Sequence, residues 1–552
     1  MADRYWILGT GTWSSTNTVN WSATSGGLGG ASVPTAADNV FFDVNSNVGT
    51  TAFTVTMADT PRVCNDFLAS GLDGTMTLAG TSIGLTVSGS LTFQATNFTR
   101  SYTGTTTFNA TTTGKTVTTN GVAFNGTVLF DGVGGGWTLG SALTNGGGRS
   151  TQLLNGTLDL SSYTLSTGFF SSSNSNTRTI AFGTGQITVS GTSTTIWNTP
   201  IVTGLTTTGN QVVNITNATG TSRTIVTGSL SEANSISFNI SGALGTLTML
   251  NTASETVRSL DFTGFGGTLN ATSTGTIYGN LKLSTGMTLT AIGSAMTFGA
   301  TSGTQQITTN AKTINFPLTF NGVGGTFQLQ DALTMGSTRT ATLTNGTLDL
   351  NGKTLTVGTA FTTATGTKNL TFNGGTLVCP AATTTAFNNA QPTNFTTTAG
   401  TGVGTISMTA ATAKTFVGGG STFNCTLNQG GAGALTITDS NTFSNITNTY
   451  KSTGATSILF TAATTSTFAD WNASGESTRL LTIGSVTAAS HTLSKASGTV
   501  SSDFLSISRS TATGGAGWYA GANSTDGGNN SGWIFTAPPA PSGSNSNFLM
   551  FF

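Results

Sequence analysis

Apolar and polar residues alternate in very short runs along most of this chain. In the segment Thr157–Leu158–Asp159–Leu160, every second residue is leucine and the others are polar. A period of two places apolar side chains on one face of a strand and polar side chains on the other. Runs of this kind, such as TVLF, TLDL, TIAF and QITV, are separated by NG, GT, GG or SG dipeptides that favour tight turns. The pattern therefore predicts an all-β chain with many turns.

The sequence also contains a long internal repeat. Residues 128–165 and 318–355 are identical at 20 of 38 positions, at a constant offset of 190 and without a gap. Substitutions between the two segments keep aromatic with aromatic and aliphatic with aliphatic, and beyond them Trp197 matches Phe387. Substitutions that preserve the class of side chain are typical of residues that stack in an interior.

Strands this short cannot bury a core alone, but successive turns of a coil give each strand a partner above and below. We therefore expect a repeat-built parallel β-helix, or β-solenoid, with turns of about 22–25 residues stacked about 4.8 Å apart. Two repeats of this size would form a rod on the order of 80 Å long. Matched Thr, Ser and Asn residues would form hydrogen-bonded ladders on the outside. The alternative fold is a series of tandem β-sandwiches.

The repeat divides the chain into five predicted parts. These are an N-terminal cap (1–57), a first solenoid repeat (58–257), a second repeat (258–445), a C-terminal cap module (446–537) and a linker with an apolar tail (538–552).

Tryptophan is concentrated near the two ends of the chain. Six of the eight tryptophans lie there, and only Trp137 and Trp197 lie between them: the six are Trp6, Trp13, Trp21, Trp471, Trp518 and Trp533. Because the open ends of a solenoid expose unpaired strand edges, we expect these indoles to plug the terminal turns. The alternative is an aromatic platform for glycan rings, formed by Trp518, Tyr519 and Trp533.

The last residues combine a Pro/Gly/Ser linker, TAPPAPSGSNSN, with an apolar pentapeptide: Phe548, Leu549, Met550, Phe551 and Phe552. An apolar segment exposed to water favours association, so we expect an assembly peg that docks in a groove of a neighbouring subunit. The alternative is a frayed terminus without a role.

Composition narrows the possible partners. Charged residues make up 7% of the chain, and the eighteen basic and eighteen acidic residues cancel, whereas about 25% is usual in soluble domains. No net field attracts nucleic acid or an anionic membrane. Neither a secretory signal nor a membrane span is predicted. With 36% apolar residues the chain is not expected to be disordered.

Candidate chemistry is sparse. Cys64, Cys379 and Cys425 are far apart and form no CxxC pair, so we expect buried free thiols and no zinc site. His491 is the single histidine, which leaves no second one for a metal site or a Ser-His-Asp relay. We expect it to lie at the surface or to pack in a cap. No catalytic residue, cofactor or metal is predicted.

The carboxylates lack the pairing that a glycosidase requires. Asp159 and Asp349 occupy identical NGTLDL contexts, which indicates turn or ladder residues, and Arg149 and Arg339 are their expected ion-pair partners. An acidic glycan is the alternative ligand of these arginines. The remaining acids considered are Asp131 (Asn321 in the second repeat), Asp38 and Asp43 as Asx-turn residues, and Asp261, Asp331, Asp439 and Asp503, none with an acidic neighbour in sequence.

Both ends of the chain carry a more specific resemblance. The opening RYWILGTGTWSSTNTVNWSATSGG…VPTAADNVFFD resembles the start of β-solenoid surface or fibre proteins of environmental tailed phages. Its spacing of Trp, Asn-Trp, Gly, Pro and Asp is also similar to repeats of bacterial autotransporter-type adhesins. The stretch 468–535, from FADWNASG to NNSGWIF, is similar to the terminal module of the same phage proteins. These motifs cover about a fifth of the chain and supply no catalytic residues.

The resemblance implies a non-enzymatic virion surface protein, either a fibre, a spike or a capsid-surface appendage, that attaches to the host surface. Expected partners are further copies of the chain (a trimer by analogy with other virion rods), other virion proteins and a host surface glycan, with neither nucleic acid nor membrane insertion. One alternative is a bacterial extracellular adhesin or filament subunit. The other is a polysaccharide depolymerase tailspike on the same scaffold.

Overall fold

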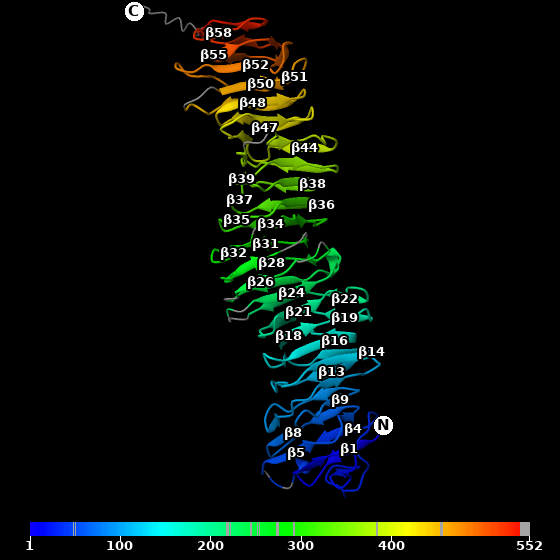
Figure 1. Ribbon diagram of the computed structural model, residues 1–552. Coiled ribbons are helices and arrows are strands. Elements are labelled where there is room, and N and C mark those ends of the chain that lie inside the picture. Colours follow the sequence, from blue (N-terminus) through cyan, green and yellow to red (C-terminus); the bar gives the residue numbers. More distant parts are fainter. Residues whose placement is uncertain are drawn as a thin grey trace, which may run out of the picture. The chain divides into compact units, whose positions relative to one another are not determined.

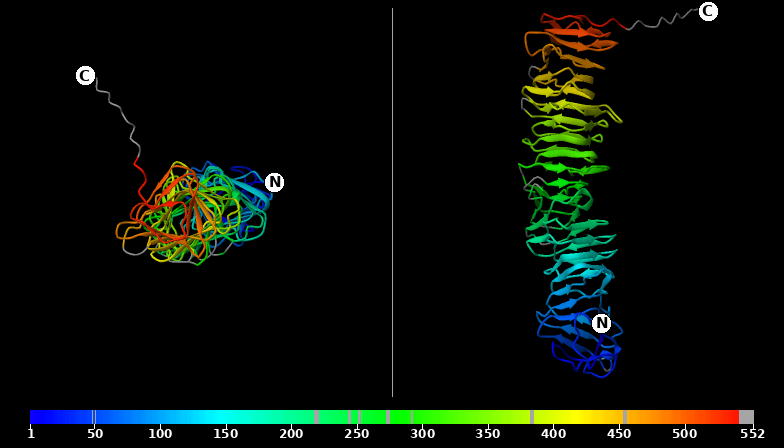
Figure 2. Two further views of the ribbon diagram at one scale, coloured as in Figure 1. Left: turned by 90° about the horizontal axis from the view of Figure 1, so that it is seen from above. Right: turned by 90° about the vertical axis from the view of Figure 1, so that its right-hand side faces the viewer.

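The computed structural model describes residues 1–47, 49, 51–216, 220, 222–242, 245–250, 252, 254–271, 275–290, 293–381, 385–452 and 456–540. It is all-β, with 48% strand and 1% helix, and its parallel strands form a β-solenoid of about 21 turns. Figures 1 and 2 show the strands stacked turn upon turn. The predicted solenoid is confirmed, and the tandem-sandwich alternative is not.

The chain divides into two compact units, Met1–Thr297 and Phe298–Phe552. These units are not the two sequence repeats, so the predicted repeat boundaries stay a prediction. Strand β33 (Met296–Phe298) crosses the division.

Unit 1 contains three groups of hydrogen-bonded strands. The first group comprises β1 (Asp3–Trp6), β3 (Trp21–Ser22), β4 (Asn39–Phe42), β6 (Arg62–Cys64), β7 (Phe67–Ala69), β9 (Leu85–Val87), β10 (Leu91–Thr92), β12 (Thr106–Phe108), β13 (Lys115–Thr118), β14 (Val128–Leu139), β16 (Ser150–Asp159), β18 (Phe169–Ser171), β19 (Arg178–Ala181), β21 (Thr195–Thr199), β22 (Leu205–Thr208), β24 (Arg223–Thr227), β26 (Thr246–Thr248), β29 (Thr268–Asn270) and β32 (Thr288–Leu289). The second comprises β2 (Gly11–Trp13), β5 (Phe53–Met57), β8 (Met76–Ala79) and β11 (Phe98–Arg100). The third comprises β15 (Leu143–Thr144), β17 (Thr164–Thr167), β20 (Gln186–Val189), β23 (Val212–Ile215), β25 (Ser237–Ile240), β27 (Thr256–Val257), β28 (Leu260–Asp261), β30 (Thr276–Ile277) and β31 (Leu281–Lys282). Two short 3-10 helices, η1 (Val44–Ser46) and η2 (Glu232–Asn234), lie between strands.

Unit 2 also contains three groups of hydrogen-bonded strands. The first comprises β34 (Thr304–Thr308), β36 (Leu318–Leu329), β38 (Ala341–Asp349), β40 (Phe361–Thr363), β41 (Lys368–Thr371), β43 (Phe387–Asn388), β44 (Phe395–Thr398), β46 (Lys414–Val417), β48 (Gly433–Thr438), β50 (Thr456–Phe460), β52 (Leu481–Ser485), β55 (Leu505–Ile507) and β58 (Thr525–Asp526). The second comprises β35 (Thr313–Ile314), β37 (Leu333–Met335), β39 (Thr354–Thr356), β42 (Thr376–Cys379), β45 (Gly404–Met408), β47 (Thr422–Gln429), β49 (Thr442–Asn448), β51 (Thr465–Phe468), β53 (His491–Ser494) and β56 (Ser510–Thr513). The third comprises β54 (Thr499–Ser501), β57 (Gly517–Tyr519) and β59 (Trp533–Ile534).

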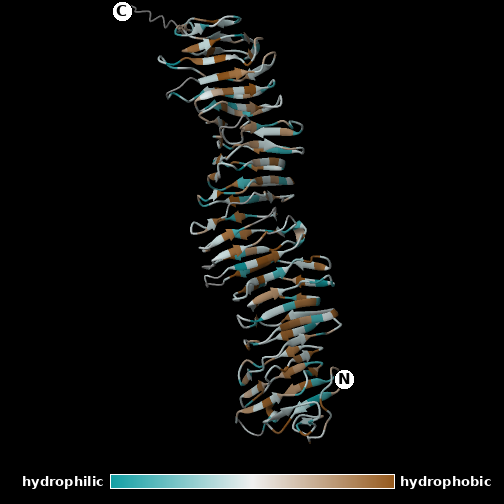
Figure 3. Ribbon diagram, in the orientation of Figure 1, coloured by the Kyte–Doolittle hydropathy of each residue, from teal (hydrophilic) through white to brown (hydrophobic). Residues whose placement is uncertain are grey.

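The core follows directly from the alternation in the sequence. Every second side chain of a strand points inward and stacks on its equivalent one turn later, and Figure 3 shows the resulting change of hydropathy along single strands. In unit 1 the rings of Phe108 and Phe130 stack at 4.9 Å. In unit 2 those of Phe298 and Phe320 stack at 5.4 Å. Leu158 is fully buried, as the pattern predicts.

The outer face carries the hydrogen-bonded ladders that the sequence predicts. In unit 1 the hydroxyl oxygens of Thr77 and Thr99 lie 2.9 Å apart across neighbouring turns. In unit 2 the hydroxyl oxygens of Thr342 and Thr362 lie 3.0 Å apart. Uncharged polar side chains of adjacent turns therefore bond to each other on the outside of the coil.

Both ends are closed by indoles, as the plug interpretation predicts. At the N-terminal end β1 pairs antiparallel with β3 and parallel with β4. This arrangement brings Trp6, Trp13 and Trp21 together, with ring centroids 5.1 Å apart for Trp6 and Trp21 and 5.2 Å apart for Trp13 and Trp21. All three indoles are buried. They cover the first turn of the coil.

The three cysteines are buried and unpaired, in agreement with the prediction. Burial raises the pKa of Cys379 to about 12, and it raises the pKa values of Cys64 and Cys425 as well. The thiols therefore stay protonated and act as small apolar side chains.

Candidate functional site

The C-terminal end of the coil holds a cluster of three indoles. Ring centroids lie 5.7 Å apart for Trp471 and Trp518, 6.2 Å for Trp471 and Trp533, and 5.1 Å for Trp518 and Trp533. Each indole N–H donates a hydrogen bond inside the protein: Trp518 to the carbonyl of Thr513 at 3.0 Å, and Trp533 to the hydroxyl of Ser510 at 3.0 Å. The cluster is a satisfied hydrophobic plug.

The predicted glycan platform does not form as one surface. Trp518 is 1% exposed and Trp533 is 9% exposed. Tyr519 follows Trp518 directly in β57, so its side chain points to the opposite face of the strand and is half-buried. A sugar ring could stack on the two indoles only if the cap rearranged. The predicted peg, Phe548 to Phe552, lies outside the described residues.

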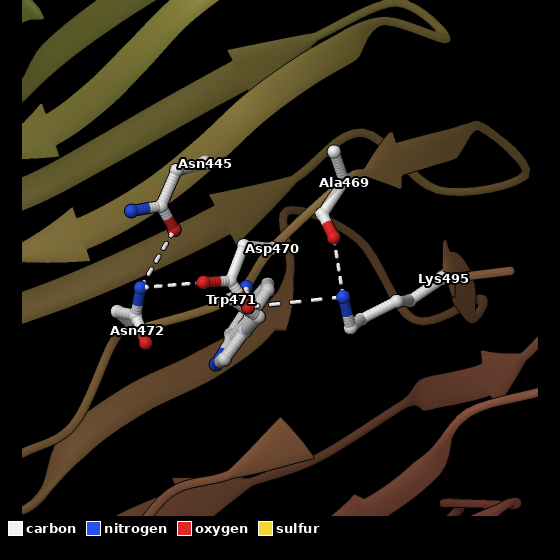
Figure 4. Close-up of polar contacts among 6 residues, drawn as sticks. All are labelled: Asn445, Ala469, Asp470, Trp471, Asn472 and Lys495. Carbon is white, nitrogen blue, oxygen red and sulfur yellow. Dashed lines mark hydrogen bonds and ion pairs between the residues drawn. The ribbon is translucent and has the colours of Figure 1, made fainter. Parts of the chain in front are cut away.

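A polar rim surrounds this plug, and Figure 4 shows its contacts. Lys495 donates a hydrogen bond to the carbonyl oxygen of Ala469, and its Nζ lies 3.7 Å from a carboxylate oxygen of Asp470. Asn472 donates to the other oxygen of Asp470 at 3.0 Å and to Asn445 at 3.3 Å. These bonds join neighbouring turns and leave Asp470 in a structural role.

The acids near the chain ends accept hydrogen bonds from the backbone. Asp38 accepts from the N–H groups of Thr35 and Ala2, at 3.0 and 3.1 Å, and from the Thr35 hydroxyl. Burial alone would raise the pKa of Asp38, but these hydrogen bonds lower it. Asp43 caps helix η1. The Asx-turn prediction is confirmed for Asp43, which accepts from the N–H of Asn45 at 2.9 Å, whereas Asp38 accepts from residues that precede it and forms no Asx-turn.

The acids of the coil behave in the same way. Asp331 accepts from the N–H groups of Thr309 and Asn310, at 2.8 and 2.5 Å. Asp439 accepts from the N–H of Gly419 at 2.9 Å. Four further acids accept from a neighbouring backbone N–H or side chain or form an ion pair: Asp131 from Asn155, Asp261 from Thr263 and with Lys282, Asp503 from Asn523, and Asp159 from Ser161. Most of these carboxylates fix a turn, whereas Asp131 links neighbouring strands through Asn155.

The predicted arginine–aspartate pairing is wrong. In the described part of the chain, ion pairs join Lys282 to Asp261 and Lys495 to Asp470, whereas neither Arg149 nor Arg339 pairs with Asp159 or Asp349. Asp349 instead accepts from Asn351, Gln328 and Asn373. Arg149 and Arg339 lie just before the NGTLDL strands in the sequence. The carboxylates of Asp159 and Asp349 instead accept hydrogen bonds from the turn residues Ser161 and Asn351. The prediction of Asp159 and Asp349 as turn and ladder residues is confirmed.

His491 was expected either at the surface or packed in a cap, and it packs in the cap. Its ring stacks on Phe460 at 4.7 Å, and its Nδ1 lies 2.9 Å from the hydroxyl of Ser485. Burial lowers the pKa of His491 to about 4, so the ring is neutral at physiological pH.

Several basic side chains are buried in the interior and were not predicted from the sequence. Arg178 is buried, and its five N–H groups donate to the Ser172 hydroxyl and to the carbonyl oxygens of Ser172, Asn176, Ile201 and Thr203. The residue 190 positions later, Lys368, is also buried and donates to the carbonyl oxygens of Gly366 and Thr393. Backbone carbonyls thus satisfy charges that no carboxylate neutralises.

Lys414 is a third case. It is buried and donates to the carbonyl oxygens of Ala410, Gly431 and Ala432, at 2.9, 3.3 and 2.7 Å. Burial lowers its pKa to about 8.

The sequence does contain a signal for these cations. Arg178, Ile180 and Phe182 alternate in the same register, and so do Lys368, Leu370 and Phe372. A basic residue with the parity of the apolar residues must point inward. Its inward direction was therefore predictable, whereas its carbonyl partners in the next turn were not.

Among the described residues, no group of three or more His, Cys, Asp or Glu could hold a metal ion. In the same residues no helix has the length and apolar character of a membrane span. Comparisons with protein-family models, curated proteins and solved structures found no match for this chain.

Proposed function

We propose that this chain is a non-enzymatic structural protein on the surface of a tailed-phage virion, where it serves as a fibre, spike or capsid appendage and attaches to the host. The observation that carries the proposal is a β-solenoid of about 21 turns with indole-plugged ends and a hydroxyl-rich exterior in a chain with only 7% charged residues. Such a scaffold suits a durable exposed element.

The durability has a physical basis. Most strands bond to the turns before and after them, so a local opening there breaks two ladders at once. The plugged ends cover apolar surface that would otherwise associate with other chains. Thiols that remain protonated and buried are protected from oxidation.

The contacts of the acids also favour a structural role. A glycosidase needs two carboxylates facing one substrate, one of them as a proton donor with a raised pKa. Most of the described acids bond to turn backbones or to Asn, Gln, Ser or Thr side chains, Asp261 and Asp470 also pair with lysines, and the pKa shifts of Asp38 and Asp503 are downward. A depolymerase tailspike is therefore the weaker proposal.

Assembly into homo-oligomers and contact with other virion proteins belong to the same proposal. The resemblance of residues 4–43 and 468–535 to phage β-solenoid proteins supports it. The similarity to adhesin repeats keeps a bacterial adhesin or filament subunit as the competing function.

The test is direct detection in purified particles. Antibodies against the recombinant chain should label the surface of intact virions, and peptides of the chain should appear in their mass spectra in stoichiometric amounts. A major capsid protein and a cytoplasmic host protein serve as the positive and negative controls. Labelling of uninfected bacterial cells, with none on particles, would favour the adhesin. Release of reducing sugar from host capsule by the pure protein would establish the depolymerase instead.

A further inference from the structure

Two open grooves, one in each unit, are built from equivalent residues. In unit 1 the groove has a volume of about 370 Å³, and in unit 2 about 360 Å³. Six lining residues of the first recur unchanged 190 positions later: Val133, Gly134, Gly135, Gly156, Thr157 and Thr177 correspond to Val323, Gly324, Gly325, Gly346, Thr347 and Thr367. These volumes fall within the range of small-ligand sites, about 300–1,000 Å³.

A large bulge in one strand forms each groove. In β14 and β16, Asp131 pairs with Asn155 and Gly136 pairs with Thr157, so residues 132–135 stand opposite Gly156 alone. In unit 2, β36 and β38 repeat this register, and residues 322–325 stand opposite Gly346. The extra residues bend away from the coil and form one wall of the groove.

A buried cation lines each groove: Arg178 in unit 1 and Lys368 in unit 2. In unit 1 this cation has no N–H group left to bond to a ligand. All five N–H groups of Arg178 bond to the protein. In unit 2 Lys368 likewise donates to carbonyl oxygens. Neither lining contains an Asp or a Glu. Both linings offer a ligand threonine hydroxyls, asparagine side chains, backbone groups and one valine side chain.

The hydroxyls are available. Those of Thr157 and Thr177 make no hydrogen bond with any other residue that the structure describes, nor do those of Thr347 and Thr367. Beside them, the isopropyl groups of Val133 and Val323 are 73% and 63% exposed. An apolar surface next to unpaired hydroxyls complements a sugar ring, which presents C–H groups on its face and hydroxyls at its edge.

The glycines of the groove have a structural explanation, whereas the valines have none. A Cβ atom on Gly135 or Gly325 would lie 2.0 Å from the carbonyl oxygen of Ala110 or Ala300, so these positions require glycine. No contact of that kind explains an exposed valine at the tip of both bulges. A ligand that covers its isopropyl group does.

We propose that each groove binds a segment of an uncharged glycan, with Val133 or Val323 against the sugar face and the paired threonines bonded to its hydroxyls. This inference rests on the proposed attachment function and names its ligand class. Arg178 uses all of its N–H groups on the protein and Lys368 donates to two backbone carbonyls, so neither cation is wholly free for a sugar carboxylate, which favours a neutral sugar over an acidic one.

The test is calorimetric titration of the full chain with neutral oligosaccharides of glucose, galactose, mannose and N-acetylglucosamine. The wild type should bind at least one of them at two sites per chain. Val133→Ser and Val323→Ser should each weaken one site by about tenfold, because loss of a buried valine surface is worth roughly one decade in Kd. The double variant should weaken both.

Matched controls separate this effect from a general change of surface. Val19→Ser and Val403→Ser remove valines that are 62% and 60% exposed and line neither groove, and both should keep wild-type affinity. Binding that persists in the double variant, no binding of any neutral sugar, or binding only of sialylated or uronate-containing sugars would each overturn the inference. If the chain is found on virions but binds no sugar, the virion proposal stands and the glycan inference fails. If the chain binds sugar at both grooves but is absent from virions, the glycan inference stands and the virion proposal fails.

Discussion

At the scale of the residue, position parity decides which side chains are buried. Leu158 and Leu348 hold equivalent inward positions in the two units and are fully buried. Replacing either with alanine should lower the free energy of unfolding by about 2–5 kcal/mol, because a cavity replaces packed atoms. Guanidinium denaturation followed by circular dichroism measures the change. Leu28→Ala is the control, since Leu28 is 94% exposed. An unchanged midpoint for both core variants would show that these residues are not interior.

The buried lysine Lys414 predicts a particular dependence of stability on pH. Its pKa is about 8 in the folded chain, against an ordinary value of 10.5. Between these values the unfolded chain binds a proton that the folded chain does not, so folding becomes more favourable as pH rises from about 8 to 10.5. The wild type should therefore gain stability relative to Lys414→Met across this window.

Parallel denaturation series at pH 7, 8, 9 and 10 measure this difference, and Lys353→Met is the control because Lys353 lies on the outer part of a turn. A constant difference between wild type and Lys414→Met would show that Lys414 keeps its ordinary pKa. A difference that decreases with pH would contradict the sign of the shift.

Residue types also mark the limit of prediction from sequence at this scale. Alternation was sufficient to place Leu158 and the cysteines inside, because a period of two leaves one choice of face. It could not supply all the partners of Arg178, since two of them are carbonyl groups contributed by the turn after it. The expected Arg149–Asp159 pair failed for the same reason: proximity in sequence does not decide which turn atoms reach the carboxylate first.

At the scale of the element, the bulged strands β14 and β36 depart most from a uniform coil. Gly156 and Gly346, which face the bulges, have φ values of +77° and +84°. A Cβ atom there would lie 2.5 Å and 2.3 Å from the carbonyl oxygens of Gly135 and Gly322. Alanine at either position should cost about 1–3 kcal/mol through backbone strain and the displaced bulge.

Thermal unfolding of Gly156→Ala and Gly346→Ala measures this cost. Gly147→Ala is the matched control, because its Cβ would meet no atom within 4 Å. If all three variants unfold at the same temperature, the bulges are not fixed by these glycines.

Turn length and strand position at this scale were predictable from the NG and GG dipeptides and from the short runs between them. The depth of the bulges was not. The run GVGGG indicated a corner, but only the register of Asp131 and Gly136 against β16 shows that four residues oppose one. Local sequence specifies that a strand bends and leaves open how far.

At the scale of the whole molecule, the indole plugs protect the terminal turns. Trp471 is buried against Phe468 and the two indoles Trp518 and Trp533. Trp471→Ala should remove about 3–5 kcal/mol from the stability of the C-terminal cap. Hydrogen exchange should then accelerate in β55, β57 and β59 and stay slow in unit 1.

Ile534→Ala, at a side chain that is 40% exposed, should leave exchange in these strands near the wild-type rate. Equal exchange in Trp471→Ala and wild type would remove the plug role from this cluster.

Function at this scale depends on the least predictable features. The solenoid follows from composition, repeats and period, because each turn meets nearly the same physical requirement as the last. The aromatic platform did not follow, because the alternation that made the solenoid predictable also sends Trp518 inward and Tyr519 outward. The two grooves could not be predicted from the sequence, because their valines differ from other exposed valines only by lying on a bulge.

The central claim is that this β-solenoid is displayed on a virion. Electron cryo-microscopy of the purified particle tests it most directly, since stacked turns about 4.8 Å apart are recognisable in a density map. If the chain is displayed on the virion, the map should contain projecting density at the particle surface into which each unit fits, with its outer face open to solvent. A complete map without such density, with the chain found instead in a homopolymer on bacterial cells, would contradict it.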